Sequence, residues 1–199
     1  MNRANRTWLV VLGLCGVATA LRLGAWLPNV SAVGALALYS GSRLRWWAWL
    51  PPLAVMAATD ALLWKWFGYP PFSRPVYAAF LIEALLGMAL VQRPTWRRVG
   101  LAGFLGALQF YLITNFFVWL KAAEMAHPTY THDLAGLLNC YIMALPFFGY
   151  TLFGNLLFAF AAFGADALLG DVNVASAGSR QAQPSALGCA RPRSAPPRG

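Results

Sequence analysis

Charged residues are scarce in this chain, and the residues that build metal or disulfide sites are scarcer still. Only 11% of the 199 residues are charged and only six are acidic, whereas about 25% of a soluble domain is charged. The three cysteines are scattered, without a C-x-x-C pair. The two histidines, His127 and His132, stand five residues apart across Pro128, so they do not share a helix face. The sequence therefore predicts no disulfide framework and no metal centre.

The motifs of soluble enzymes are also absent. The chain has no glycine-rich nucleotide loop, no nucleophile elbow and no H-E-x-x-H segment. Nothing in the sequence therefore indicates an ATPase or a soluble hydrolase. An intramembrane enzyme is not indicated either, because no nucleophile–base set is recognisable. We expect no enzymatic activity and no cofactor.

Apolar residues, in contrast, are abundant. They make up 59% of the chain, and the mean hydropathy is +0.56. A protein with so few polar groups cannot cover its surface for water, so we expect a lipid bilayer to be its solvent. The net charge of +9 is often a sign of nucleic-acid binding. Here the basic residues stand between apolar runs and near the end of the chain, as loop charges beside membrane spans do, and we expect no nucleic-acid partner.

Six apolar segments predict an all-α integral membrane protein, a bundle of about six transmembrane helices over residues 1–170. The clearest, 99–120, carries no charge and is long enough as a helix to cross a hydrocarbon layer of ~30 Å. The second is short, and the last exceeds one crossing and is expected to kink at Pro146 and Gly149. Residues 171–199, rich in Ala, Ser and Pro, are predicted to be a disordered cytoplasmic tail. The segments are 8–23, 30–41, 46–67, 76–92, 99–120 and 135–169.

Lys and Arg residues are distributed unequally between the two sides of such a bundle. With six crossings, eleven of the fifteen fall on one side and only Arg22, Lys65, Arg74 and Lys121 on the other. The positive-inside rule then predicts a multi-pass protein with both termini in the cytoplasm.

With this orientation, the polar residues of the spans gather in the outer leaflet. Asp60 is costly inside a membrane, and Arg22 or Lys65 could pair with it. Asn115 and Trp119 are four residues apart and share a helix face. Such groups either hold helices together or line an outward-facing pocket. The residues predicted to bind a ligand are Asn29, Asp60, Asn115, Trp119, Asn139 and Tyr141.

Glu83 lies in the middle of the fourth segment, at mid-membrane. A carboxyl group there is expected to be protonated or hydrogen-bonded to a neighbouring helix. A proton relay is the alternative interpretation. Asp166, near the end of the last segment, is expected at the membrane interface.

Several stretches together resemble an uncharacterised family of small bacterial membrane proteins. The resemblance covers roughly residues 22–164, and Asn155 and Gly149 depart from the family pattern, which has an acidic and a basic residue near these positions. The stretches that carry it are Pro28-Asn29, Val33-Gly34-Ala35-Leu36-Ala37-Leu38, Asp60, Thr114-Asn115-Phe116, Val118-Trp119, Ala135-Gly136-Leu137-Leu138, Cys140-Tyr141, Pro146-Phe147-Phe148, Thr151-Leu152 and Gly154.

That family is similar in turn to the substrate-binding S components of energy-coupling-factor vitamin transporters. The similarity implies six helices, cytoplasmic termini, an external ligand pocket and an energising ATPase module supplied by other chains. The expected function is capture or transport of a small organic, vitamin-like solute in the bacterial inner membrane. The alternative is a membrane scaffold or assembly protein that transports nothing, since fold analogy alone does not establish function.

Overall fold

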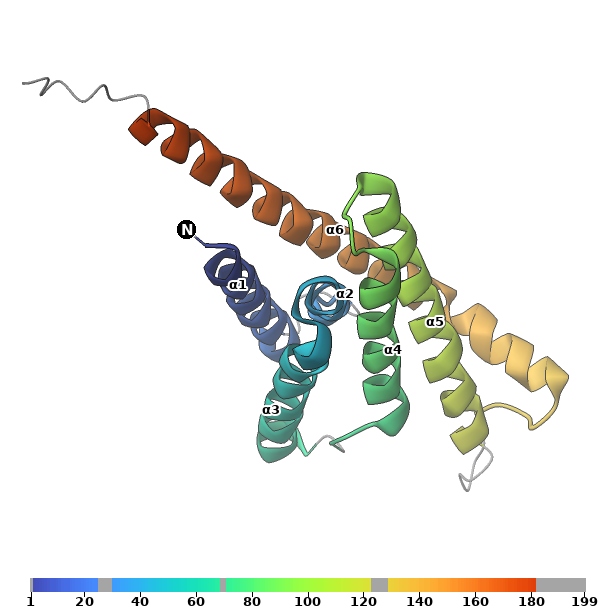
Figure 1. Cartoon of the computed structure of the whole chain (residues 1–199). Helices are drawn as coiled ribbons and strands as arrows, with labels where there is room; N and C mark the ends of the chain where they lie inside the picture. The colour runs from blue at the N-terminus through green and yellow to red at the C-terminus, as the bar shows by residue number, and fades with distance from the viewer. Residues whose placement is uncertain (1, 25–29, 69–70, 123–128, 182–199) are drawn as a thin grey trace, which may run out of the picture.

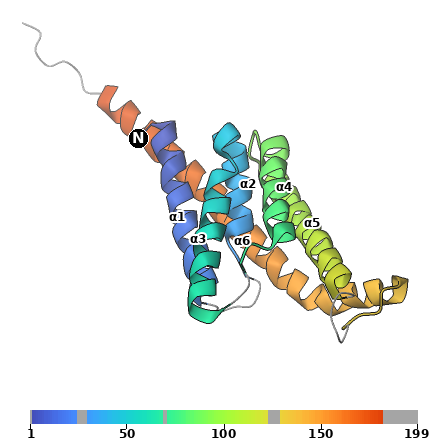
Figure 2. The same cartoon turned by 90° about the horizontal axis from the view of Figure 1, so that it is seen from below.

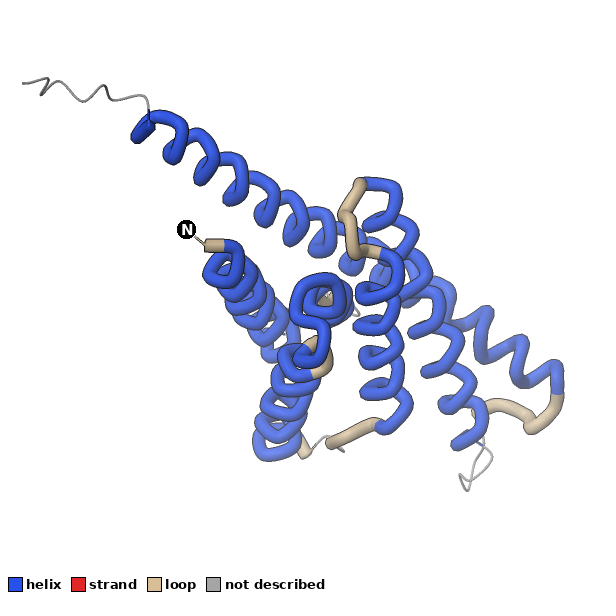
Figure 3. The backbone as a smooth tube through the Cα atoms, in the orientation of Figure 1, coloured by secondary structure: helices blue, strands red, loops and turns tan. Residues whose placement is uncertain are grey.

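The computed structural model describes residues 2–24, 30–68, 71–122 and 129–181, and this part of the chain is helical, without strands. Figures 1 and 3 show how the helices are arranged, with α6 passing behind α4 and α5. The elements are α1 (Arg3–Gly24), α2 (Val33–Leu44), the 3-10 turn η1 (Arg45–Trp47), α3 (Leu50–Phe67), α4 (Arg74–Leu90), α5 (Trp96–Ala122) and α6 (Leu134–Gln181).

Each of the six predicted apolar segments corresponds to one helix. Three helices are long and apolar enough to cross a membrane: α1, α5 and the part of α6 from Leu134 to Gly170. The remaining three, α2, α3 and α4, are shorter or less apolar. The all-helical prediction is therefore confirmed for the described residues, with three helices able to cross a membrane, and six full spans stay a prediction. Helix α6 runs past Gly170 to Gln181, beyond the predicted end of the helical domain. Residues 182–199 of the predicted tail lie outside the described part.

The short helix α2 forms the centre of the bundle. Every residue from Val33 to Gly41 is buried, and α2 packs against each of the other five helices. Figure 1 views it nearly along its axis, between α1 and α3 on one side and α4 and α5 on the other. A helix enclosed on all faces is apolar all round, and residues 33–39 are accordingly an unbroken run of apolar side chains and glycine.

Glycine brings α2 and α4 into close contact. A Cβ at Gly41 would collide with the backbone carbonyl of Ala84, and one at Gly87 would collide with that of Leu38. The backbones of the two helices therefore touch, as small residues permit in membrane bundles.

The last helix changes direction. Figure 2 shows the yellow N-terminal part of α6 running at an angle to its orange remainder, and Pro146 lies inside the helix. Proline removes a backbone hydrogen bond and kinks a helix, as the sequence predicted. The bend lets α6 follow α5 at one end and reach α1 and α2 at the other.

Tryptophan side chains are exposed at both ends of α3. Trp46, Trp47 and Trp49 surround its start, and Trp64 and Trp66 lie near its end. Tryptophan concentrates at the two membrane–water interfaces. An 18-residue helix is about 27 Å long, which matches the distance between two such interfaces.

Candidate functional site

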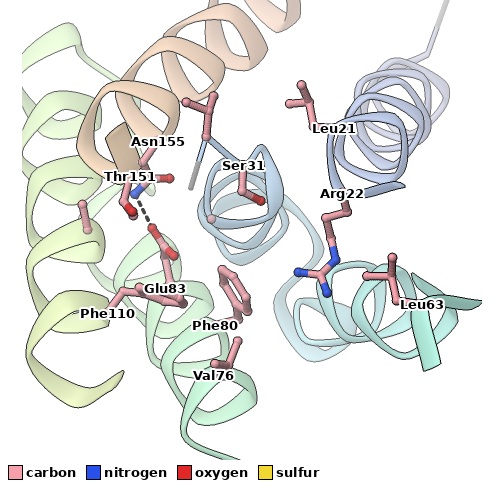
Figure 4. A pocket seen from close by; sticks show the side chains of 13 residues that line it. Leu21, Arg22, Ser31, Leu63, Val76, Phe80, Glu83, Phe110, Thr151 and Asn155 are labelled. Carbon is pink, nitrogen blue, oxygen red and sulfur yellow. Dashed lines mark hydrogen bonds between the residues drawn. The ribbon is translucent and has the colours of Figure 1, made fainter. Parts of the chain in front are cut away.

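A cavity of about 430 Å³ lies among the helices, near the end of α1 and the start of α2 and α4. Figure 4 shows its walls, which come from all six helices and from the segment before α2. Most of the lining is apolar. Besides Arg22, four polar or charged side chains border the cavity: Ser31, Glu83, Thr151 and Asn155. The lining residues are Leu21, Arg22, Val30, Ser31, Gly34, Leu63, Val76, Phe80, Glu83, Ala107, Phe110, Thr151 and Asn155.

Glu83 of α4 and Asn155 of α6 meet at the inner wall of this cavity. Their side chains are 1% and 3% exposed. The Asn155 amide Nδ2 donates hydrogen bonds to Oε1 of Glu83 and, at 3.0 Å, to the backbone carbonyl of Gly103 (Figure 4). The other end of the amide, Oδ1 of Asn155, is buried and has no hydrogen-bond partner among the described residues. The expectation that Glu83 bonds to a neighbouring helix is therefore confirmed.

Two glycines make room for the Glu83 carboxyl group. A Cβ at Gly34 of α2 would lie 2.6 Å from Oδ1 of Asn155 and 2.7 Å from Oε2 of Glu83. A Cβ at Gly106 of α5 would collide with Oε1 of Glu83. The polar pair therefore fits between α2 and α5 only because both helices carry glycine at these positions.

No cationic side chain compensates the Glu83 carboxyl group. In the described part of the chain, the three salt-bridge contacts involve Asp60 once and Asp166 twice. An unpaired carboxylate in a low-dielectric environment is unfavourable. The Asn155 amide supplies one hydrogen bond and no charge, so Glu83 has no counter-charge among the described residues.

Arg22 lies on another side of the cavity and is already paired. Its Nη2 is 2.5 Å from Oδ1 of Asp60, and its Nε donates to Oγ1 of Thr59 at 2.7 Å. Oδ2 of Asp60 accepts a hydrogen bond of 2.9 Å from the Tyr77 hydroxyl and one of 3.3 Å from the Phe72 backbone. The predicted Arg22–Asp60 pair is therefore confirmed, and Asp60 reaches the cavity only through Arg22.

A second buried carboxylate, Asp166 of α6, lies away from the cavity. Its Oδ1 is 2.7 Å from Nε of Arg6, and its Oδ2 accepts a hydrogen bond from Nη2 of Arg43. Asp166 is only 2% exposed, so it lies among packed helices, and its expected depth at the membrane interface stays a prediction. The two guanidinium groups of α1 and α2 account for its burial, because they compensate its charge.

Asn115 and Tyr141, two other predicted ligand-binding residues, lie where α5 meets α6. The Asn115 amide donates to the Tyr111 carbonyl of its own helix at 2.8 Å. The Tyr141 hydroxyl donates to the Leu112 carbonyl at 2.9 Å, and its ring packs 5.4 Å from that of Tyr111. Asn115 also borders a smaller hollow of about 210 Å³, which shares Phe110 and Thr151 with the main cavity.

The remaining predicted residues lie elsewhere. The indole of Trp119 donates to the Thr131 carbonyl at 3.0 Å and stacks on His132 at 4.4 Å between ring centroids. Asn139 is exposed on α6, and Asn29 lies outside the described residues. The structure therefore separates Trp119 and Asn139 from the cavity, and does not gather the predicted set into one site.

Sequence analysis did not assign Ser31, Thr151 and Asn155 to the site. One signal was available, because Thr151 and Asn155 are four residues apart and so share one face of the last helix. Nothing in the sequence placed that face opposite Glu83, which stands 72 positions away from Asn155.

Comparison with known proteins identifies a family and no activity. No curated protein and no solved structure matches the chain. The model of one family, described as a family of unknown function (DUF6580), matches residues 2–177. Because this match covers most of the sequence, the chain belongs to DUF6580, a family of unknown function.

Proposed function

We propose that this chain is an integral membrane protein that captures a small organic solute in the cavity beside Glu83 and Asn155. The observation that carries the proposal is the Asn155 amide oxygen, which is buried without a partner at a cavity of about 430 Å³. Buried polar groups that serve only packing are normally hydrogen-bonded. A cavity of this size, mostly apolar with a few convergent polar groups, is typical of small-molecule sites.

The proposal includes an external opening in the bacterial inner membrane. Arg22, Ser31 and Val76 line the cavity near the end of α1 and the start of α2 and α4. Arg6 and Arg43 lie at the opposite ends of α1 and α2. Under the positive-inside rule, the ends with more Lys and Arg face the cytoplasm, so the cavity would open to the exterior.

Topology reporters test this orientation. Fusions after Arg45 and Arg98 should report the cytoplasm, and fusions after Tyr69 and Met125 should report the exterior. A cytoplasmic signal after Met125 would contradict the proposed opening.

The proposed energy source is an ATPase module supplied by other chains. This part rests on the similarity to energy-coupling-factor S components, which would make the chain their solute-binding subunit. The sequence itself carries no nucleotide-binding loop. Co-purification of an ATPase with the tagged protein from its native membrane would support the proposal.

Native mass spectrometry of the protein in lipid nanodiscs tests solute capture directly. We expect a small molecule to remain bound to the parent protein. The Thr151→Trp variant should lose it, because the larger side chain occupies cavity space. Val118→Trp is a matched control, since valine has the shape of threonine and Val118 is exposed on α5. A solute that stays bound to the Thr151→Trp variant would exclude this cavity as its site.

A membrane scaffold is the second candidate function. It is favoured by polar side chains that already bond to neighbouring helices. Gln109 donates to the Ala79 carbonyl at 3.0 Å, and the Tyr111 hydroxyl to the Tyr141 carbonyl at 2.6 Å. If such contacts are the only role of the polar residues, Thr151→Trp will alter stability and no solute will be found on the parent.

A further inference from the structure

We infer that the solute carries a cationic nitrogen, a protonated amine or an equivalent N–H-rich cation, that pairs with Glu83 and donates to Oδ1 of Asn155. This inference rests on the proposed function and assigns the chemical class of its solute. Three features of the cavity support it: uncompensated charge, unpaired acceptors and apolar walls.

The charge of the cavity favours a cation. Glu83 is buried, and no basic side chain pairs with it in the described part of the protein. The nearby cation, Arg22, is bound to Asp60 and Thr59 on α3. With Arg22 and Asp60 neutralising each other, an ionised Glu83 gives the cavity a net negative charge, which a positive group on the solute would balance.

The hydrogen-bonding geometry favours a donor. Oδ1 of Asn155 has no partner within the described residues. It lies 2.6 Å from the point where a Cβ of Gly34 would stand, and Oε2 of Glu83 lies 2.7 Å from that same point. The two oxygens are therefore neighbours, and one ammonium group with three N–H donors can reach both. Both atoms are acceptors when Glu83 is ionised, so these two oxygens offer no donor to an anionic or acceptor-only group.

The remaining walls fit an apolar, ring-sized body. Leu21, Leu63 and Val76 line the cavity together with Phe80 and Phe110, whose ring centroids are 5.2 Å apart. Figure 4 shows Phe80 and Phe110 near Glu83, with Val76 on the far side of Phe80. Aromatic side chains in such a wall pack well against a flat ring.

Three probes that share an indole ring and a two-carbon linker test the inference on the parent protein. They are tryptamine, which is cationic at pH 7, tryptophol, which is neutral, and indole-3-propionate, which is anionic. Calorimetric titration into nanodiscs, with empty nanodiscs subtracted, should show tryptamine binding at least about tenfold more tightly than the other two. Equal affinities for all three would overturn the cation preference while leaving solute capture intact.

Two charge-matched variants locate the preference. The Glu83→Gln variant keeps the shape of the side chain and a hydrogen bond to Asn155, and should bind the three probes with affinities within about threefold of one another. The Asp133→Asn variant removes one carboxylate from an exposed position before α6 and should keep the preference. A tryptamine preference that survives Glu83→Gln would overturn the assignment to Glu83.

The molecule bound to the parent protein tests the cationic class of the solute without any variant. Its mass and fragmentation show whether it contains a protonatable nitrogen, and a solute without one overturns this inference alone. A parent that carries no small molecule and binds none of the three probes overturns the proposed function, and this inference with it.

Discussion

Two carboxyl groups are buried in the described part of the protein, those of Glu83 and Asp166, and their surroundings differ. Both are at most 2% exposed. Asp166 contacts two guanidinium groups, from Arg6 and Arg43, and lines none of the described cavities. Glu83 contacts one neutral amide, from Asn155, and borders open space.

The difference shows that burial alone does not identify a functional acid. Around Asp166, three helices are joined by compensated charges, since Arg6 belongs to α1, Arg43 to α2 and Asp166 to α6. Arg43 also lies 6.0 Å and 5.9 Å from the ring centroids of Tyr39 and Phe163. This arrangement is that of a structural cluster. A carboxyl group with neither a counter-charge nor full packing has a different role, and we assign it to solute binding.

The largest expected difference between Glu83 and Asp166 is in the free energy of unfolding when each carboxylate is replaced by the corresponding amide. Asp166→Asn leaves two half-buried guanidinium groups without a counter-charge and should lower the free energy of unfolding by about 3–5 kcal/mol. Glu83→Gln should change it by less than about 1 kcal/mol, because no ion pair is broken. Thermal unfolding in one detergent measures both. Equal losses for the two variants would remove the distinction drawn here.

Arg22 and Asp60 form a third cluster. Like Asp166, Asp60 has a counter-charge, and like Glu83, Arg22 borders the cavity. Asp60→Asn should lower the free energy of unfolding by about 1.5–3 kcal/mol, the usual effect of losing a hydrogen bond to a charged group. It also leaves Arg22 without a counter-charge beside the cavity, so tryptamine should bind less tightly. Unchanged tryptamine affinity would show that the charge of Arg22 does not reach the bound solute.

Glycine-to-alanine substitutions test how tightly the Glu83 site is built. Gly34→Ala should destabilise the protein by about 1–3 kcal/mol, because the new Cβ lies under 3 Å from Glu83 and Asn155 oxygens. Gly13→Ala on α1 is the control, since nothing lies within 4 Å of its Cβ position. That change should be neutral or stabilising by about 0.5–1 kcal/mol. A harmless Gly34→Ala would show that the Glu83 side chain is not held in place.

The smallest expected effect belongs to Asp133, an acid outside both clusters. The Gly136 backbone N–H and the Thr131 hydroxyl, which both donate to its carboxylate, lower the pKa of Asp133 below its usual 3.8. A lowered folded-state pKa means that the ionised form stabilises the fold above pH 3.8, and that this stabilisation is lost as the pH falls through the folded value.

Asp133→Asn checks this sign, because asparagine also caps helices and does not titrate. The variant should lose the small decline in melting temperature that the parent shows below pH 3.8. If the melting temperature of parent and variant falls equally below pH 3.8, another group causes the decline.

Much of the architecture follows from local sequence. Apolar runs such as residues 99–120 indicated helices, and Pro146 indicated the bend in α6. The short second segment appears as the buried helix α2. The pairing of Asp60 with Arg22 was also expected, because both residues stand near the outer ends of their helices.

The residues of the candidate site could not be predicted from local sequence in the same way. Trp119 and Tyr141 make hydrogen bonds that join α5 to α6 or to the segment before it, and Asn115 donates within its own helix. Sequence analysis assigned them to helices or to helix ends but had no means of orienting their side chains. A site requires side chains from several helices to face one point, and the rotation of each helix about its axis is set by packing.

The amino-acid sequence alone therefore determined the membrane class, the positions of the helices and the unequal distribution of basic residues. These properties depend on runs of consecutive residues, because hydropathy and helix length are local quantities. Only the tertiary structure decided that Glu83 meets Asn155, 72 positions away, and that Asp166 meets Arg43, 123 positions away. Those contacts depend on glycines that let α2 approach its neighbours and on the path of a bent α6, which no single segment encodes.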